Sequence, residues 1–516
     1  MKKQNNIEII GCQAKMVVSF KEGKWTVITL DLEHNHELSP PDESKHLRSH
    51  KHMTEDEKLF IRTFNSVKLA TRKIMAILAY LRGGVSYLPY NKKYVSNVRT
   101  AIRNESKLND MTQVLQYFRK RKEADPRFYY NFKLGEKKKV LSLFWADGHS
   151  RKMYELYGDC VSFDTTYKTN RYNLPFAPFV GVTGHGNNCL FGCAFMQDET
   201  SDTFKWLFEV FDECHGHKHP LTIITDQCKS MKIAIPLVFP NTIHRFCFFH
   251  IWKKALEKCG RSFATKKDLH EDFSDILRNS LTVEEFEMLW QEMLARYDVC
   301  NLKYFQAMWE YRKNFVPVYF KNCFFPFIHS TARSEGTNSV FKDNVGSTYS
   351  VISFLAEYQR ISESNEEKEK EQDSLTRTTT PTYWAHSEIE YQAGRTYNRQ
   401  VFYKFQKQLM FTSKLHVDEV VKNERYEVYK TRYIAKKEFR TRRFVVLVNL
   451  EQQDFSCICC KFQKDGIVYS HILRVLVNLN ILELPDRYFV DRWKPKERKT
   501  IRDKKYSIPM QLTEKD

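Results

Sequence analysis

Short apolar runs that end in a carboxylate mark the middle of the chain. One such run is followed directly by Asp164 and another by Asp226. Two further β-prone runs, 176–183 and 189–196, are separated by a segment rich in Gly and Asn, so the first three runs predict an antiparallel meander. Because strand ends in α/β sheets open onto the ligand crevice, the two acids are predicted to face a common site.

Helical periodicity begins after Ser201. One apolar helical face is formed at i, i+3, i+4 and i+7 by Phe204, Leu207, Phe208 and Phe211. The pattern then predicts a helix from about residue 229, a strand near 242–246 and a helix from about residue 249. Three strands followed by alternating helices and strands is the order of a ribonuclease H-like α/β core, with Asp164 and Asp226 on neighbouring strands.

Other elements are predicted on the N-terminal side of this core. A hairpin is expected over 128–145, and helices over 61–81, 92–104 and 113–123. The last helix contains the basic cluster 119–122, which either contacts phosphates or forms a solvated helix face.

Composition narrows the choice of partners. The 516 residues include 82 Lys and Arg against 63 Asp and Glu, a net charge of +19. Such an excess favours a polyanionic partner, most often nucleic acid, although a generally basic protein is the alternative. No stretch approaches the ~20 apolar residues of a membrane span, and no signal peptide is recognised, so an intracellular protein without a membrane partner is expected. The thirteen cysteines are expected to be reduced, and those that are clustered are expected to bind metal.

Several motifs resemble a known family when taken together. The segment 163–172, the pair Asp226-Gln227 and the Cys247-x-x-His250 pair are similar to the transposase domain of Mutator-like elements. They resemble in particular the version carried by the plant far-red impaired response family, whose third acid lies in a Ser-Glu-x-x-Asn segment matched by Glu335. The likeness runs from Gly11 to about residue 493.

The resemblance implies a site of three acids. Asp164, Asp226 and Glu335 would hold two Mg²⁺ or Mn²⁺ ions about 3.5–4 Å apart for strand cleavage. The long segment between the last two acids is predicted to be a helical insertion, about 252–325. Its apolar residues mostly have helical periodicity, and it is too long for a loop. One departure is Cys228, where the family usually has a further acid, and this change lowers the expectation of activity.

Two groups of cysteine and histidine residues are candidate metal ligands, one in the predicted core and one near the N-terminus. Cys247 and His250 either pack against the core or act near DNA or a metal, as the resemblance implies. Cys12, His34 and His36 resemble the second half of the family's WRKY-like zinc finger. Structural zinc sites use four ligands, so this remnant of three is expected to bind zinc weakly or to stay partly unfolded.

A third group resembles a SWIM zinc finger. Its ligands would be Cys457, Cys459 and His471, but Tyr469 stands at the remaining ligand position. A phenol with a pKa near 10 is a poor zinc ligand, and Cys460 could replace it only after the hairpin rearranges. We therefore expect a degenerate finger with uncertain Zn²⁺ occupancy. A dense basic segment follows over 494–505, which import receptors or phosphates could bind.

The boundaries expected from these features divide the chain into seven parts. They are a WRKY-like remnant (1–38), a linker and helices (39–127), a transposase-like core (128–361), a charged linker (362–382), a helical region (383–443), a SWIM-type finger (444–480) and a basic tail (481–516). The charged linker is expected to be a solvated helix that ends in a flexible link at 376–380.

Two functions follow from the resemblance. The first is a nuclear, DNA-binding regulator of transcription in light-responsive gene control, without enzymatic activity and able to form homo- or hetero-oligomers with family members. The second is an active transposase that uses the three acids. The degenerate fingers favour the first.

Overall fold

The computed structural model describes most of the chain. The described residues are 11–38, 52–66, 69–105, 110–136, 139–167, 169–328, 330–347, 349–435 and 442–495. The chain divides into two compact units, Met1–Asn109 and Asp110–Asp516. Most of the predicted basic tail and of the linker from residue 39 lies outside the described residues.

The N-terminal unit contains a hairpin and a small helical core. Strands β1 (Lys15–Lys21) and β2 (Lys24–Asp31) pair antiparallel, and nearly all their side chains are exposed. Ile61, Ile74, Leu78 and Val95 lie in the buried core of the helices. These helices are α1 (Glu55–Ser66), α2 (Thr71–Leu81) and α3 (Lys92–Glu105). The helices predicted over 61–81 and 92–104 are therefore present, with the first divided in two.

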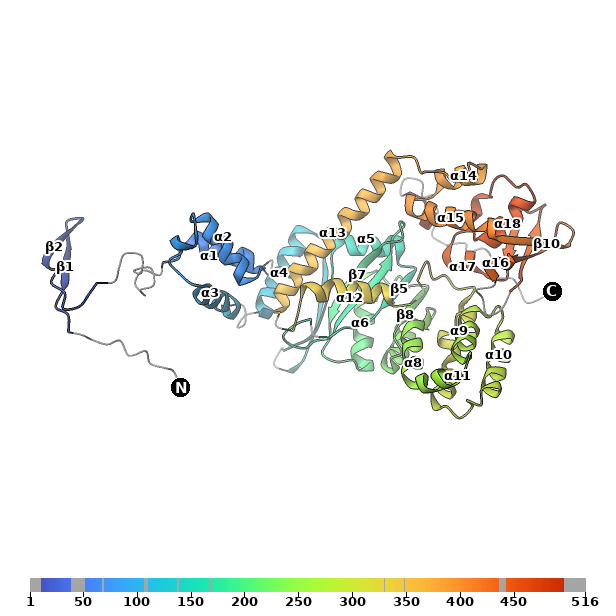
Figure 1. Cartoon of the computed structure of the whole chain (residues 1–516), viewed down its shortest axis with the longest axis horizontal. Coiled ribbons are helices and arrows are strands. Elements are labelled where there is room, and N and C mark those ends of the chain that lie inside the picture. The colour runs from blue at the N-terminus through green and yellow to red at the C-terminus, as the bar shows by residue number, and fades with distance from the viewer. Residues whose placement is uncertain are drawn as a thin grey trace. The chain divides into compact units, whose positions relative to one another are not determined.

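A seven-stranded mixed sheet forms the centre of the second unit (Figure 1). Its order is β3-β4-β7-β6-β5-β8-β9, with β5, β8 and β9 parallel and the other pairs antiparallel. The strands are β3 (Tyr129–Leu134), β4 (Val140–Ala146), β5 (Cys160–Phe163), β6 (Phe176–Val182), β7 (Asn188–Phe195), β8 (Thr222–Thr225) and β9 (Ile243–Phe246). The predicted meander and hairpin are confirmed, as is the placement of Asp164 and Asp226 after neighbouring strands.

Aromatic side chains attach helices to both faces of this sheet. On one face Phe179 stacks on Phe211 of α6 with ring centroids 4.1 Å apart. On the other, Phe176 lies 4.7 Å from Phe354 of α13. The first face is covered by α5 (Gly148–Tyr157), α6 (Ser201–Cys214) and α7 (Lys229–Val238), and the second by α4 (Asp110–Ala124), α12 (Ala332–Asn344) and α13 (Val351–Thr378). The basic helix expected over 113–123 is thus part of the core unit.

A helical insertion follows β9, as predicted. It has its own core, in which Phe273, Trp290 and Phe305 are fully buried. Its helices are α8 (Phe248–Thr265), α9 (Leu269–Asn279), α10 (Val283–Arg296) and α11 (Lys303–Phe315). The chain then returns to the sheet at α12.

The charged linker expected over 362–382 is helical, as its pattern predicted. Helix α13 continues without a break to Thr378, and its charged half buries Glu369. The helix is therefore not fully solvated, because His185 on the turn between β6 and β7 contacts Glu369 and Asp373. Only residues 379–382 form a connection.

The C-terminal part packs two helices against a second sheet. The sheet order is β10-β11-β12-β13, and all its pairs are antiparallel. Its elements are α14 (Glu388–Thr396), α15 (Arg399–Phe411), β10 (Leu415–Val421), β11 (Arg425–Lys430), α16 (Arg432–Ala435), β12 (Phe444–Asn449), β13 (Asp454–Cys457), α17 (Lys461–Asp465) and α18 (Ser470–Asn478). A helical region was expected over 383–443, and α14 and α15 confirm it as far as Phe411. The prediction is wrong for β10 and β11, because Tyr426 and Val428 alternate into the core with the period of a strand.

Candidate functional site

Parallel pairing brings Asp164 and Asp226 to the same edge of the sheet. Ser162 on β5 is in register with Ile224 on β8, and each acid follows two residues later. Asp164 is 8% exposed and Asp226 is half-buried. The two carboxylates are close enough for their charges to interact, since Asp226 contributes to raising the pKa of Asp164.

Glu335 reaches this edge from the other side of the insertion. It lies in the first turn of α12, and the preceding residue of that helix, Ser334, is buried. The Oγ of Ser334 is 2.6 Å from the Oγ of Ser162, so the helix is attached to β5 two residues before Asp164. Asp226 and Glu335 both lie close enough to Asp164 to help raise its pKa, although Asp226 and Glu335 are 109 positions apart in sequence.

Cys247 and His250 belong to the same cluster. Cys247 follows β9, beside Asp226, and its backbone N–H donates to the carbonyl of Thr225 at 2.6 Å. His250, in the first turn of α8, places Nε2 3.5 Å from Oε1 of Glu335. One ligand atom from each of Cys247, His250 and Glu335 lies within 4.8 Å of the others.

Thr331 connects these groups, and sequence reasoning did not single it out. Its backbone N–H donates to Sγ of Cys247 at 3.2 Å, and its hydroxyl donates to Glu335 at 3.1 Å. The hydroxyl is also 3.4 Å from Nδ1 of His250. Thr331 is fully buried, so it fixes the Cys247–His250 pair relative to the third acid.

Burial and mutual repulsion change the acidity of the cluster. Burial, together with Asp226 and Glu335, raises the pKa of Asp164 to about 7. Burial likewise raises the pKa of Asp226. A hydrogen bond with Cys247 raises the pKa of His250 to about 9, so the imidazole is a cation at neutral pH. Burial opposes ionisation of Cys247, but hydrogen bonds from His250 and Thr331 outweigh it and lower its pKa.

The arrangement fits a divalent cation at the first two acids. Oδ1 of Asp226 is buried and accepts no hydrogen bond within the described residues. A cation would supply the missing partner and relieve the repulsion that raises the pKa of Asp164. A fourth carboxylate, Glu199, lies close enough to raise the pKa of Asp226 and accepts a 2.5 Å hydrogen bond from Thr165. Nothing in the sequence pattern singled out Glu199.

Three of the predicted ligands of the C-terminal finger converge. One ligand atom from each of Cys457, Cys459 and His471 lies within 4.8 Å of the others. A hydrogen bond between the thiols lowers the pKa of Cys459 and raises that of Cys457, which favours one thiolate. Tyr469 does not bond to these ligands. Its hydroxyl donates to Asp465 at 2.7 Å, and burial raises its pKa. The site thus offers three ligands, and Tyr469 does not fit as a fourth.

The N-terminal cluster is similar in composition but is exposed. Cys12 Sγ is 3.5 Å from Nδ1 of His34, which is 3.4 Å from Nε2 of His36. Backbone N–H groups of Ala14 and Asn35 lower the pKa of Cys12. These three residues also fit a zinc ion as a three-ligand set.

A basic groove adjoins the C-terminal cluster. It has a volume of about 1240 Å³ and is bordered by α9 of the insertion and by the C-terminal sheet and helices, including Cys459 and His471. Its acidic lining residues are Glu271 and Asp275, and Asp275 pairs with Arg442 at 2.6 Å. The basic residues that line it are Arg278, Lys321, Lys407, Lys414, Lys430, Arg442 and Lys461. Such a surface favours an anionic ligand.

No helix among the described residues is both long enough and apolar enough to cross a membrane.

Comparison with known proteins agrees with this geometry. Residues 160–254, which include Asp164, Asp226, Cys247 and His250, match the MULE transposase domain. The chain is 34% identical over 494 residues to FAR1-RELATED SEQUENCE 5 of Arabidopsis thaliana, covering 96% of this chain and 62% of that protein. It is 29% identical to FAR-RED IMPAIRED RESPONSE 1 of the same plant, covering 95% of this chain and 59% of that protein. The chain spans about 60% of the length of these relatives. It therefore contains a MULE transposase domain and is homologous to the FAR1-related sequence proteins over most of its length.

Proposed function

We propose that this protein is a nuclear, DNA-binding regulator of transcription built on a domesticated transposase domain. The observation that carries the proposal is the homology to FAR1-related sequence proteins over 96% of the chain. Their names point to the far-red light response, so light-responsive gene control is the role we assign. The strand order β7-β6-β5-β8-β9, with the last three strands parallel, supports a ribonuclease H-like core.

The basic groove supports DNA as the partner. Phosphates would be bound along Lys407, Lys414 and Lys461, which lie beside the C-terminal cysteine cluster. Each phosphate contact releases counterions, so affinity should fall steeply with salt. A zinc ion on Cys457, Cys459 and His471 would hold the hairpin that borders this groove.

Residual catalysis is the second candidate, and the acid cluster is the observation that favours it. The unpartnered Oδ1 of Asp226 and the adjacent Asp164 would hold Mg²⁺ or Mn²⁺, which supplies an activated water or hydroxyl for strand cleavage. Glu335, however, is engaged by Thr331 and by the cationic His250. It would have to leave both before it could complete a two-metal site, and this favours regulation over catalysis.

Two assays on the same 516-residue chain distinguish these functions. DNA binding is measured at several salt concentrations for the native chain and for a Lys407→Gln, Lys461→Gln double variant. Strand cleavage is measured with Mn²⁺ on the same DNA. The regulator predicts salt-sensitive binding, a shallower salt slope in the double variant and no cleavage.

Lys205→Gln is the control variant for the binding assay. It removes a charge from α6, outside the groove, and should leave binding unchanged. Cleavage that disappears in Asp164→Asn would establish the transposase instead. Absence of any salt-dependent DNA binding would refute the regulator.

A further inference from the structure

A second group of metal-ligand side chains lies away from the acid cluster. His185 stands on the tight turn between β6 and β7, which is closed by a hydrogen bond from Thr183 N–H to the Asn187 carbonyl at 2.8 Å. Glu369 and Asp373 face this turn from one side of α13, one helical turn apart. Nε2 of His185 is 2.8 Å from Oδ1 of Asp373 and 4.0 Å from Oε1 of Glu369.

Burial makes this group unusual. His185 is 2% exposed and Glu369 is 4% exposed. Oε1 of Glu369 accepts no hydrogen bond within the described residues, because Nε2 of His185 at 4.0 Å is too far away to donate one. Burying a carboxylate oxygen without a hydrogen bond is costly. One imidazole can carry a single positive charge against the two carboxylates, so even the protonated trio keeps a net negative charge.

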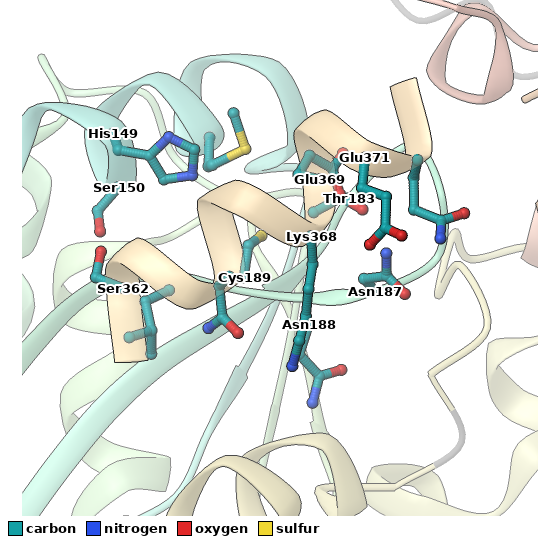
Figure 2. Close-up of a pocket in the computed structure, with 14 residues that line it drawn as sticks. His149, Ser150, Thr183, Asn187, Asn188, Cys189, Ser362, Lys368, Glu369 and Glu371 are labelled. Atoms are coloured by element: carbon teal, nitrogen blue, oxygen red, sulfur yellow. The ribbon is translucent and has the colours of Figure 1, made fainter. Parts of the chain in front are cut away.

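Space for a ligand adjoins Glu369. A cavity of about 330 Å³ is lined by Glu369 together with Thr183 and Asn187 of the turn. Figure 2 shows Glu369 on the α13 ribbon beside Thr183, with Asn187 opposite. The cavity is therefore bordered by the same two elements that supply the trio, and it can admit a water as an additional ligand.

We propose that His185, Glu369 and Asp373 form a zinc site, with a water from the cavity as the fourth ligand. Zinc bonds of 2.0–2.2 Å place tetrahedral ligand atoms about 3.3 Å apart. The distances of 2.8 and 4.0 Å from Nε2 of His185 to the two carboxylates bracket that value. An imidazole with two carboxylates suits zinc better than Mg²⁺, which prefers oxygen ligands alone. A neutral imidazole, two carboxylates and Zn²⁺ sum to zero charge.

The site would join three parts of the second unit. Next to His185, the carbonyl of Gly184 accepts a 2.9 Å hydrogen bond from Nδ2 of Asn398, just before α15. The next residue, Arg399, donates its backbone N–H to the hydroxyl of Thr376 on α13 at 3.2 Å. Zinc would thus fasten the sheet, α13 and the C-terminal helices where they meet.

Zinc counting in the intact chain tests the proposal. The native chain and the variants His185→Gln and Glu369→Gln are loaded with zinc, freed of excess metal and analysed for zinc per chain. Each variant should lose about one zinc per chain and should be stabilised less than the native chain by added zinc. Glu371→Gln is the matched control, because Glu371 lines the same cavity but lies outside the trio.

A measurement without substitutions covers the case in which a variant does not fold. Anomalous diffraction at the zinc edge from crystals of the native chain should show a peak between His185, Glu369 and Asp373. Equal zinc counts in folded variants and native chain would overturn the proposal, as would zinc peaks only at the cysteine clusters or nowhere.

Discussion

The hydroxyls of Ser162 and Ser334 lie 2.6 Å apart in the interior of the second unit. This hydrogen bond joins β5 to α12 and so sets the position of Glu335 relative to Asp164. The chain leaves the sheet after β9, forms the helical insertion and returns here. Convergence of the acids therefore depends on a buried contact between residues 172 positions apart.

Ser334→Ala tests this attachment. It leaves the Ser162 hydroxyl without its partner, and an unsatisfied buried polar group costs about 1–3 kcal/mol. We expect the free energy of unfolding to fall by that amount and Mn²⁺ binding to weaken, as measured by denaturant titration and calorimetry. Ser330→Ala, which removes a hydroxyl just before α12, is the control and should change both much less. Equal effects of the two substitutions would contradict the account.

Asp164→Asn tests the electrostatics of the acid cluster. The pKa of Asp164 rises from 3.8 to about 7 in the folded protein, so its carboxylate opposes folding as the pH rises through this interval. Without bound metal, the variant should be more stable than the native chain by up to about 4 kcal/mol at pH 8, with the difference vanishing near pH 4. Denaturant unfolding of both chains, measured across this pH range in the presence of a chelator, tests the predicted difference in stability. A variant less stable at pH 8 would show that the carboxylate is not strained.

Tyr469→Cys tests the degenerate finger. It removes a hydroxyl that donates to Asp465 and introduces a thiol at the expected ligand position, completing a Cys₃His set. Zinc affinity, measured by competition with a chromogenic chelator, should rise at least about tenfold. Tyr469→Phe removes the same hydroxyl without adding a ligand and should show no increase. If both variants behave alike, residue 469 does not face the metal position.

Arg492→Met tests how the C-terminal part is attached. Arg492 pairs with the fully buried Asp159, and its Nη2 donates to the carbonyl of Val182 at 2.5 Å. Removing one partner of a buried ion pair typically costs about 3–5 kcal/mol. We expect a loss of that size in denaturant unfolding, largely recovered in an Arg492→Met, Asp159→Asn double variant. No recovery would mean that packing of the side chain matters more than its charge.

The sequence predicted the parts of the site that follow strands. Asp164 and Asp226 were found because short apolar runs precede them, and parallel pairing then aligned them. Glu335 has no such local signal and was reached through resemblance to a family. Thr331 and Glu199 were missed because their roles come from tertiary contacts across the insertion and the sheet.

The charged half of α13 is helical as expected, but its burial was not predicted, for a related reason. Its alternating charges are typical of a solvated segment, whereas Glu369 is buried against His185, a residue 184 positions earlier in the chain. Likewise, the β10–β11 hairpin was expected to be helical, because short strands with one exposed face carry a weak pattern. In both cases the deciding partner is distant in sequence.

Mn²⁺ binding by the 516-residue chain tests the central claim most directly. Titration calorimetry at pH 8 compares the native chain with Asp164→Asn, Asp226→Asn and the control Asp343→Asn, which removes an exposed carboxylate from α12. A single pocket predicts that each of the first two substitutions weakens binding at least about tenfold, whereas the control changes nothing. Native affinity in both acid variants would contradict a shared cation site.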